Sequence, residues 1–257
     1  MHYLGIDIGS SATKTVAIDT GGNVLAGVAI QLGTGTKGVD EAVDETYQRS
    51  ALKREDCLGT VATGYGRLTF KGADMQVSEI TCHMRGIRSI FPEVKTIIDI
   101  GGQDLKAIQL DSKGGIAQFV MNDKCAAGTG RFLDVMSRVL GLSIEILGET
   151  DKEAAEILPI SNTCTVFAES EVISRLAESR PIPDIVAGIH QSVARKAAGL
   201  ALRIGVLPRV CLTGGVAQNK GIIAALEKEL GHQLLIPQNP QLTGALGAAL
   251  IALEKYS

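Results

Sequence analysis

Residues 4–22 read LGIDIGSSATKTVAIDTGG, and residues 96–114 read TIIDIGGQDLKAIQLDSKG. The two stretches share Asp-Ile-Gly, a lysine five residues later, and then an aspartate and a glycine, all at one offset of 92 positions. Each copy predicts a strand ending at Asp-x-Gly, a polar loop, a second strand, a glycine-containing turn and a third strand. A repeat of this kind governs the expected fold, because each copy forms one supersecondary unit. We therefore predict two related halves.

The duplication predicts an α/β protein of two domains, which fits a length of 257 residues. We expect the first domain over residues 1–93, completed by a C-terminal helix at 243–257, and the second over residues 94–242. Apolar periodicity predicts helices at 37–52, 78–91, 131–140 and 185–204, and another after Cys164 with Val166, Val172, Ile173 and Leu176 facing inward. A charged stretch at 145–156 predicts a surface helix.

The composition is that of an ordinary globular protein, with 45% hydrophobic residues and a net charge of −3. This balance argues against a nucleic-acid partner or an anionic membrane surface. No uninterrupted apolar run approaches the ~20 residues of a membrane span. The N-terminus lacks the basic and apolar regions of a signal peptide. We expect a cytoplasmic protein.

The loop after the first strand is the first candidate phosphate site. Its spacing is not that of a P-loop, but a glycine turn at a strand end can direct backbone N–H groups at phosphate oxygens. Asp7 offers a hard oxygen to hydrated Mg²⁺, and Lys14 adds a positive charge. A single copy would read as a polar hairpin; its recurrence favours a site. The predicted nucleotide-binding residues here are Ser10, Ser11, Ala12, Thr13 and Lys14.

The equivalent loop of the second copy carries an amide and a carboxylate where the first copy has small residues. We expect Gly101, Gly102 and Gln103 to bind nucleotide, Gln103 to position water, and Asp104 to bind Mg²⁺. Asp7, Gln103 and Asp104 are the predicted catalytic residues. Two such loops facing one another could clamp a nucleotide.

A third element, residues 213–219, is an apolar strand that breaks at two glycines. Bare glycine backbone allows close approach of a flat ring or ribose. The predicted residues are Gly214, Gly215, Val216 and Asn219, to which we add Gln241.

In this order the three elements resemble the phosphate-1, phosphate-2 and adenosine motifs of the actin, Hsp70 and sugar-kinase superfamily. That resemblance implies two ribonuclease-H-like domains with the nucleotide in the cleft between them. A shared fold of this kind does not choose a function.

Five cysteines disfavour a disulfide framework in a cytoplasmic chain. Cys125 and Cys164 are each predicted immediately before a helix, where the helix dipole stabilises a thiolate and an anionic cluster. Cys211 is expected in the core and Cys57 exposed, while Cys82 is undecided. A [4Fe–4S] cluster needs four thiolates, which Cys125 and Cys164 of two chains would supply in a homodimer.

Residues 122–133 and 161–171, with the Asp-Ile-Gly-Gly-Gln-Asp and Thr-Gly-Gly-Val-Ala-Gln-Asn runs, make the resemblance specific. Over essentially its whole length the chain resembles the activators (component A) of 2-hydroxyacyl-CoA dehydratases, such as that for (R)-2-hydroxyglutaryl-CoA, and the related ATPase subunits of benzoyl-CoA reductase. The resemblance implies an ATP-driven one-electron donor. Ferredoxin or flavodoxin would reduce its cluster, and a dehydratase or related iron–sulfur reductase would accept the electron.

Two other functions fit the nucleotide motifs. A small-molecule kinase of the same superfamily leaves Cys125 and Cys164 unexplained, as does a non-catalytic, actin-like assembly protein. For an electron donor we expect the two cysteine-bearing helices to reach the nucleotide-binding domain with their far ends, so that ATP-driven closure reorients them at the cluster.

Overall fold

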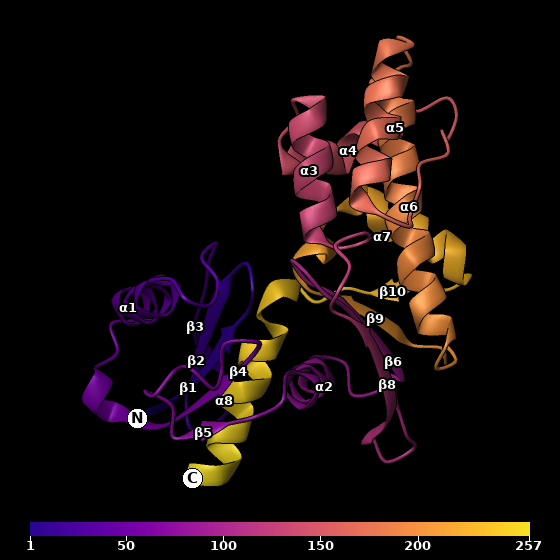
Figure 1. Cartoon of the computed structure of the whole chain (residues 1–257). Helices are drawn as coiled ribbons and strands as arrows, with labels where there is room; N and C mark the ends of the chain where they lie inside the picture. Colours follow the sequence, from indigo (N-terminus) through magenta and orange to yellow (C-terminus); the bar gives the residue numbers. More distant parts are fainter. The chain divides into compact units, whose positions relative to one another are not determined.

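Two five-stranded sheets carry the two copies of the repeat in the computed structural model, which describes residues 1–257. Two compact units contain them (Figure 1). Unit 1 comprises Met1–Val94, Gly114–Ile116 and Pro237–Ser257, and unit 2 comprises Lys95–Lys113 and Ala117–Ile236. None of the helices has the length and unbroken hydrophobicity that crossing a bilayer requires.

Unit 1 has the strand order β3-β2-β1-β4-β5, with β1 antiparallel to β2 and parallel to β4. Helix α1 lies against β2 and β3, whereas α8 lies on β1 and β4 beside α2 (Figure 1). The elements are β1 (His2–Ile8), β2 (Thr13–Ile18), β3 (Val24–Ile30), α1 (Gly38–Ser50), β4 (Cys57–Thr63), β5 (Met75–Gln76), α2 (Glu79–Ile90) and α8 (Thr243–Tyr256).

Unit 2 has the matching order β8-β7-β6-β9-β10, with β6 antiparallel to β7 and parallel to β9. The elements are β6 (Thr96–Ile100), β7 (Leu105–Leu110), β8 (Ile116–Asn122), α3 (Gly130–Leu140), α4 (Ile144–Thr150), α5 (Thr165–Ala177), α6 (Ile182–Leu202), β9 (Val210–Thr213), α7 (Lys220–Leu230) and β10 (Leu234–Leu235).

The repeat extends to side-chain pairs. Asp7 faces Lys14 across β1 and β2, and Asp99 faces Lys106 across β6 and β7. In both copies the lysine Nζ lies 3.2 Å from the aspartate Oδ2. The duplication expected from the sequence is therefore present in topology, in register and in an ion pair.

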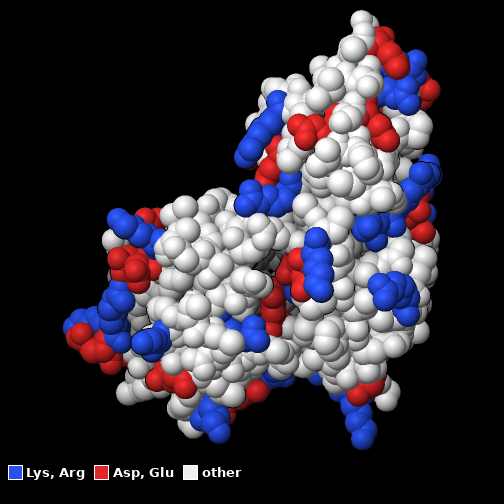
Figure 2. Space-filling view, in the orientation of Figure 1, with Lys and Arg blue, Asp and Glu red and all other residues white.

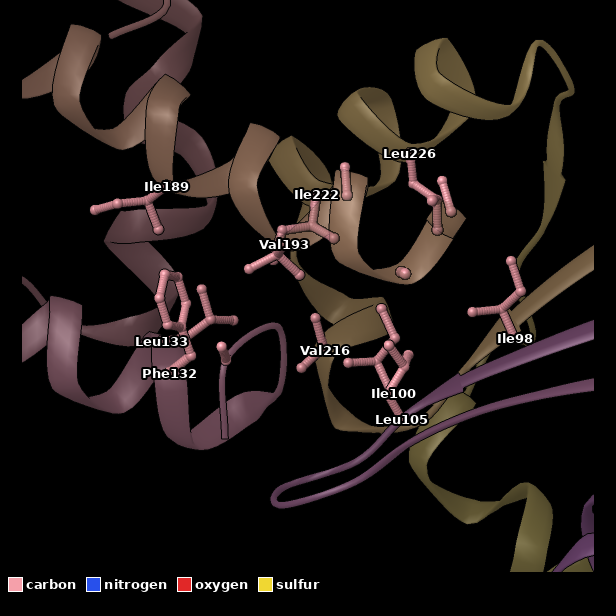
Figure 3. Packing of buried hydrophobic residues seen from close by; sticks show 14 of the residues in the cluster. Ile98, Ile100, Leu105, Phe132, Leu133, Ile189, Val193, Val216, Ile222 and Leu226 are labelled. Atoms are coloured by element: carbon pink, nitrogen blue, oxygen red, sulfur yellow. The ribbon is translucent and has the colours of Figure 1, made fainter. Parts of the chain in front are cut away.

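Each unit buries an apolar core against its own sheet. In unit 1, alternate residues of β1 point to opposite faces, so that Tyr3 packs with α8 while Leu4 and Ile6 pack on the side of α1. In unit 2, one continuous cluster joins the sheet to α3, α6 and α7 (Figure 3). The labelled members of that cluster are Ile98, Ile100, Leu105, Phe132, Leu133, Ile189, Val193, Val216, Ile222 and Leu226.

Two predicted helical features of unit 2 are wrong. The helix expected over residues 145–156 ends at Thr150 and is followed by a 3₁₀ turn at Asp151–Glu153. The buried Asp184 carboxylate accepts hydrogen bonds from the N–H groups of Ala155 and Glu156, which draws those residues out of the helical path.

The inward face predicted for α5 is the second error. Val172 and Ala168 are buried, but Val166 and Ile173 are more than half exposed, as is Phe167. The helix packs through a narrow strip that includes the small side chain of Ala168, so that large apolar residues beside the strip remain at the surface. On the face shown in Figure 2, cationic and anionic side chains are interspersed.

Candidate nucleotide site and cysteine segment

The phosphate-1 loop is a tight turn between β1 and β2, closed by a 3.0 Å hydrogen bond from Gly9 N–H to the Ala12 carbonyl. The Ser11 hydroxyl oxygen is buried and has no hydrogen-bond partner in the protein. A phosphate oxygen could accept a hydrogen bond from this hydroxyl. Thr13 differs from expectation: its side chain is buried, and its hydroxyl donates to the Leu32 carbonyl at 2.8 Å. This hydroxyl holds the loop in place, so Ser11 is the better phosphate donor.

Asp7 lies at the end of β1 and is 2% exposed. One carboxylate oxygen, Oδ2, accepts from Lys14, while the other, Oδ1, is buried without a hydrogen-bond partner. Gly64, at a φ of +85°, packs against this oxygen, and a Cβ at position 64 would lie only 2.4 Å from Oδ1. An unpartnered carboxylate oxygen is a hard ligand that fits a hydrated Mg²⁺ ion.

The start of α8 also borders Asp7, a feature that sequence reasoning missed. A Cβ at Gly244 would lie 3.2 Å from Asp7 Oδ2 and 3.3 Å from the ring of buried His83. His83 Nδ1 is 3.1 Å from the Thr243 hydroxyl. No local sequence pattern predicts the contact between His83 and Thr243, because 160 positions separate them. The predicted residue Gln241 lies in the 3₁₀ turn that leads into α8, partly buried.

The phosphate-2 loop repeats the turn of the first copy, with Gly101 N–H donating to the Asp104 carbonyl at 3.0 Å. Gln103 is exposed at its tip. Lys106 is 1% exposed and lies 2.8 Å from Asp104 and 3.2 Å from Asp99. Sequence reasoning gave neither Asp99 nor Lys106 a role, although the offset that relates them to Asp7 and Lys14 could have done so.

The adenosine element adjoins the phosphate-2 loop because β9 is parallel to β6, with Thr213 beside Asp99. Gly214 has a φ of +89°, and a Cβ there would lie 2.3 Å from the Ile100 carbonyl oxygen. Gly215, in contrast, faces open space. Bare backbone thus contacts the neighbouring strand at one glycine and leaves room for a ligand at the next.

Asn219 has a structural task. Its Oδ1 accepts from the Ile222 N–H at 2.9 Å and caps α7, while its Nδ2 lies 3.3 Å from His190 Nε2. The oxygen and the nitrogen of the amide therefore both have partners inside unit 2. Asn219 would affect nucleotide binding by fixing the position of the loop before α7. Val216, also predicted, is buried in the core cluster.

The start of α3, which follows the cysteine segment (residues 122–129, with Cys125), is hydrogen-bonded to the phosphate-2 loop. The first N–H groups of a helix have no partner within the helix. In α3 those of Gly130 and Arg131 donate to the carbonyls of Gly101 and Gly102, at 2.9 and 2.8 Å. We expected the far end of this helix to reach the nucleotide-binding domain. In α3 it is instead the start of the helix that contacts the phosphate-2 loop.

Cys164 is the N-cap residue of α5, as expected. Cys125 does not directly precede α3, because a turn at residues 126–129 intervenes, closed by Thr129 N–H donating to the Ala126 carbonyl at 3.0 Å. The Cys125 thiol lies 3.7 Å from the Thr163 carbonyl oxygen and donates to it. Both cysteines are partly exposed, and the segments that carry them touch.

The remaining thiols differ in burial. Cys211 is fully buried, as expected, and so is Cys82. Burial raises the pKa of the Cys82 thiol to about 12 and also raises the pKa of Cys211. Cys57, expected to be exposed, is partly buried with its thiol 3.6 Å from the Gly59 carbonyl, because it begins β4.

The predicted site residues form two groups, each within one unit. Unit 1 holds Asp7, Ser10, Ser11, Ala12, Thr13, Lys14 and Gln241. Unit 2 holds Gly101, Gly102, Gln103, Asp104, Gly214, Gly215, Val216, Asn219, Cys125 and Cys164. Unit 2 therefore brings together one phosphate loop, the adenosine element and both cysteine segments.

The chain is similar to known proteins over nearly its whole length. Residues 4–252 match the BadF/BadG/BcrA/BcrD ATPase family. The activator of lactoyl-CoA dehydratase from Anaerotignum propionicum is 53% identical over 254 residues, which cover 99% of this chain and 98% of that protein.

Solved structures show the same relationship. The activator of the 2-hydroxyisocaproyl-CoA dehydratase from Clostridium difficile with bound ADPNP has a TM-score of 0.97 and 50% identity, covering 100% of this chain and 96% of that one. A ROK family glucokinase from Streptomyces griseus, with a TM-score of 0.60 and 14% identity over 99% of this chain and 100% of that one, shares the fold alone. The predicted actin-like and sugar-kinase fold class is confirmed.

Proposed function

Because the chain belongs to the BadF/BadG/BcrA/BcrD ATPase family, we propose that it couples ATP hydrolysis to one-electron transfer from a [4Fe–4S] cluster held by a homodimer. The electron would come from reduced ferredoxin or flavodoxin. It would go to a 2-hydroxyacyl-CoA dehydratase or a related iron–sulfur reductase, which it activates.

One observation carries this proposal. The N–H groups of Gly130 and Arg131 bond to the carbonyls of Gly101 and Gly102, and Cys125 contacts the residue before Cys164. A shift of the phosphate-2 loop would therefore act on the start of α3 through two hydrogen bonds, and on Cys125 through the turn that precedes α3. Nucleotide can change this region only if the ATP and ADP states contact it differently, and the loop is where the γ-phosphate would lie.

In the nucleotide site we assign catalysis to Asp7, Gln103 and Asp104. The exposed amide of Gln103 would orient the attacking water. Asp104 and Asp7, whose Oδ1 has no hydrogen-bond partner in the protein, are each proposed as a ligand for Mg²⁺. Ser11 and Lys14 would contact phosphate oxygens, and Gly215 would adjoin the adenosine. Hydrolysis would yield ADP and inorganic phosphate.

The thiols fit a cluster shared by two chains. Cys82 and Cys211 are buried in their cores, and Cys57 belongs to unit 1. Unit 2 therefore offers two partly exposed thiols, Cys125 and Cys164. Four thiolates require a second copy of this pair. When bound, the cluster would supply one-electron chemistry; the chain's own part is to hold the two thiols at contacting segments, with α5 beginning directly after Cys164.

The dehydratase partner is supported by two relatives. Proteins 53% and 50% identical to this chain are named as activators of lactoyl-CoA and 2-hydroxyisocaproyl-CoA dehydratases. Their substrates are both 2-hydroxyacyl-CoA thioesters, so we propose a partner of that class. The exposed Val166 and Phe167, next to Cys164, give the cysteine end of α5 an apolar surface suited to protein contact.

The cluster is tested by anaerobic purification and iron analysis. We expect a brown protein with about four irons per dimer, and Cys125→Ser or Cys164→Ser should each remove the cluster from the whole dimer. Cys57→Ser is the matched control, since that thiol lies in unit 1, and it should retain full iron content. Four irons per monomer, or a colourless wild-type protein, would refute the shared cluster.

Coupling needs a second experiment. A chelator should strip iron at clearly different rates from the ATP-bound and ADP-bound forms. With a non-hydrolysable analogue, transfer to the dehydratase should stop after at most one electron. Equal chelation rates, together with multiple turnovers in the absence of hydrolysis, would show that ATPase and cluster are unconnected.

A further inference from the structure

Three polar side chains of unit 2 lie together at the adenosine element: His190 and Asn219 are buried, and Asp151 is partly exposed. We propose that His190 is a positioning residue for adenosine binding, because it fixes the side-chain amide that caps α7. The inference rests on the nucleotide site proposed above and deepens it. No role in contact with nucleotide is assigned to His190 itself.

The imidazole is sandwiched between two polar groups. His190, on α6, is 1% exposed. Its Nδ1 lies 2.8 Å from Asp151 Oδ2, and its Nε2 lies 3.3 Å from Asn219 Nδ2. A carboxylate only accepts hydrogen bonds, so Nδ1 carries a proton. Asn219 Oδ1 already accepts from the Ile222 N–H, so the N–H₂ group faces Nε2, which accepts from it with its lone pair.

This tautomer decides the orientation of Asn219. An amide N–H₂ can donate to Nε2, which leaves Oδ1 to accept from the Ile222 N–H at 2.9 Å. Rotating the amide by half a turn would set its N–H₂ against the Ile222 N–H and its oxygen against the Nε2 lone pair. Both contacts would be repulsive. Asp151 therefore orients His190, and His190 orients the cap of α7.

The space around the trio is built for it. A Cβ at Gly221 would lie 2.2 Å from His190 Nδ1, so the second residue of α7 has to be glycine for the imidazole to fit. A Cβ at Gly148 would lie 3.4 Å from the Asn219 amide. Helix α4 thus also packs on this amide and restricts its movement.

The effect reaches the ligand through one short loop. Asn219 is both the last residue of the adenosine element and the cap of α7, and the 3₁₀ turn at Gly215–Gln218 connects it to Gly214. Gly214 is wedged against the Ile100 carbonyl. The loop is therefore held at both ends, and releasing Asn219 would loosen the side that faces adenosine while leaving the phosphate-2 turn intact.

Two substitutions separate the contacts of His190. His190→Asn places an amide near the position of Nδ1, so it keeps a donor for Asp151 and loses the acceptor for Asn219. His190→Gln reaches the position of Nε2, so its carbonyl can still accept from Asn219. Losing a hydrogen bond of this kind costs a binding site about three- to tenfold in affinity.

The test compares the dissociation constants of Mg-ADP and Mg-tripolyphosphate by calorimetry. We expect His190→Asn to weaken ADP binding about three- to tenfold and to leave tripolyphosphate binding unchanged, whereas His190→Gln should bind ADP nearly as the wild type does. His232→Asn, at a partly exposed histidine after α7, is the matched control and should change neither. If His190→Asn does not fold, Asp151→Ala, at a partly exposed carboxylate, releases the imidazole with less disturbance and should also weaken ADP binding.

The outcomes distinguish the two proposals. Wild-type affinity for ADP in His190→Asn, or in Asp151→Ala where the first variant is unfolded, overturns the positioning role. Equal losses for ADP and tripolyphosphate also overturn it, as do equal losses in the Asn and Gln variants, since both point to a general structural effect. If the wild-type protein itself binds no ADP, the nucleotide site fails and this inference falls with it.

Discussion

Replacing Gly247 by alanine should destabilise unit 1, because α2 and α8 touch backbone to backbone at glycines. A Cβ at Gly247 would lie 1.8 Å from the Cys82 carbonyl oxygen, and a Cβ at Gly86 would lie 2.0 Å from the Thr243 carbonyl oxygen. Neither neighbour is a flexible side chain that could rotate away. The two helices would have to separate by roughly an ångström to restore an ordinary contact.

Overpacking of this kind typically costs about 1–3 kcal/mol, and contact with backbone places Gly247→Ala toward the upper end. The gain in helix propensity offsets only about 0.5–1 kcal/mol. We therefore expect a net loss of about 2 kcal/mol, which lowers Tm by about 4–8 °C in a chain of this size. The start of α8 borders Asp7, so ATPase activity should fall as well.

Gly199→Ala is the matched control. Gly199 also lies within a helix, α6, but it is exposed and has nothing within 4 Å of a Cβ. It should gain about 0.5–1 kcal/mol from propensity alone. The free energy of unfolding is measured by urea titration followed by circular dichroism. If Gly247→Ala were as stable as the wild type, or gained as much as Gly199→Ala, the close helix contact would not be real.

Three further outcomes test the site and its surroundings. Gln103→Ala and Asp104→Ala should abolish ATP hydrolysis while nucleotide binding survives in part; unchanged turnover numbers would remove both from catalysis. Lys14→Ala should raise the dissociation constant for ATP more than it lowers turnover, and the reverse result would assign Lys14 to the transition state alone. Burial raises the pKa of the Cys82 thiol from 9.0 to about 12, so its contribution to stability is complete below about pH 9 and is lost as the pH rises toward 12. The free energy of unfolding of Cys82→Ala should therefore fall less than that of the wild type between pH 9 and pH 12. Equal decreases in the two proteins would contradict this.

The internal repeat made the fold predictable from the sequence. The pair Asp7 and Lys14 recurs as Asp99 and Lys106 at a single offset. This recurrence implied the same strand pairing in both copies, and the observed registers agree. The two turns, closed at Gly9 and Gly101, follow from the same spacing. Periodicity placed the strands and most helices because each is a local property of the chain.

Contacts between distant segments could not be predicted in this way. His83 and Thr243 lie 160 positions apart, and the contacts of buried His190 with Asp151 and Asn219 join α6 to two other segments. The length of α4 was misjudged because Asp184, on a later helix, captures the N–H groups that would have continued it. Local pattern carries no information on such partners.

The two copies also differ in a way that bears on coupling. Ala12 closes the turn of the first copy, whereas Asp104 closes that of the second. Asp104 gives Lys106 a second carboxylate within 3.2 Å, so the charge of Lys106 is balanced by its own unit and serves to hold the loop. Asp104 itself remains partly exposed. Gln103 and Asp104, both proposed for hydrolysis, thus have no equivalent in the first copy, and they lie in the loop whose Gly101 and Gly102 carbonyls accept from the N–H groups of α3. Loss of the γ-phosphate would therefore act directly on the loop whose carbonyls accept hydrogen bonds from the start of α3.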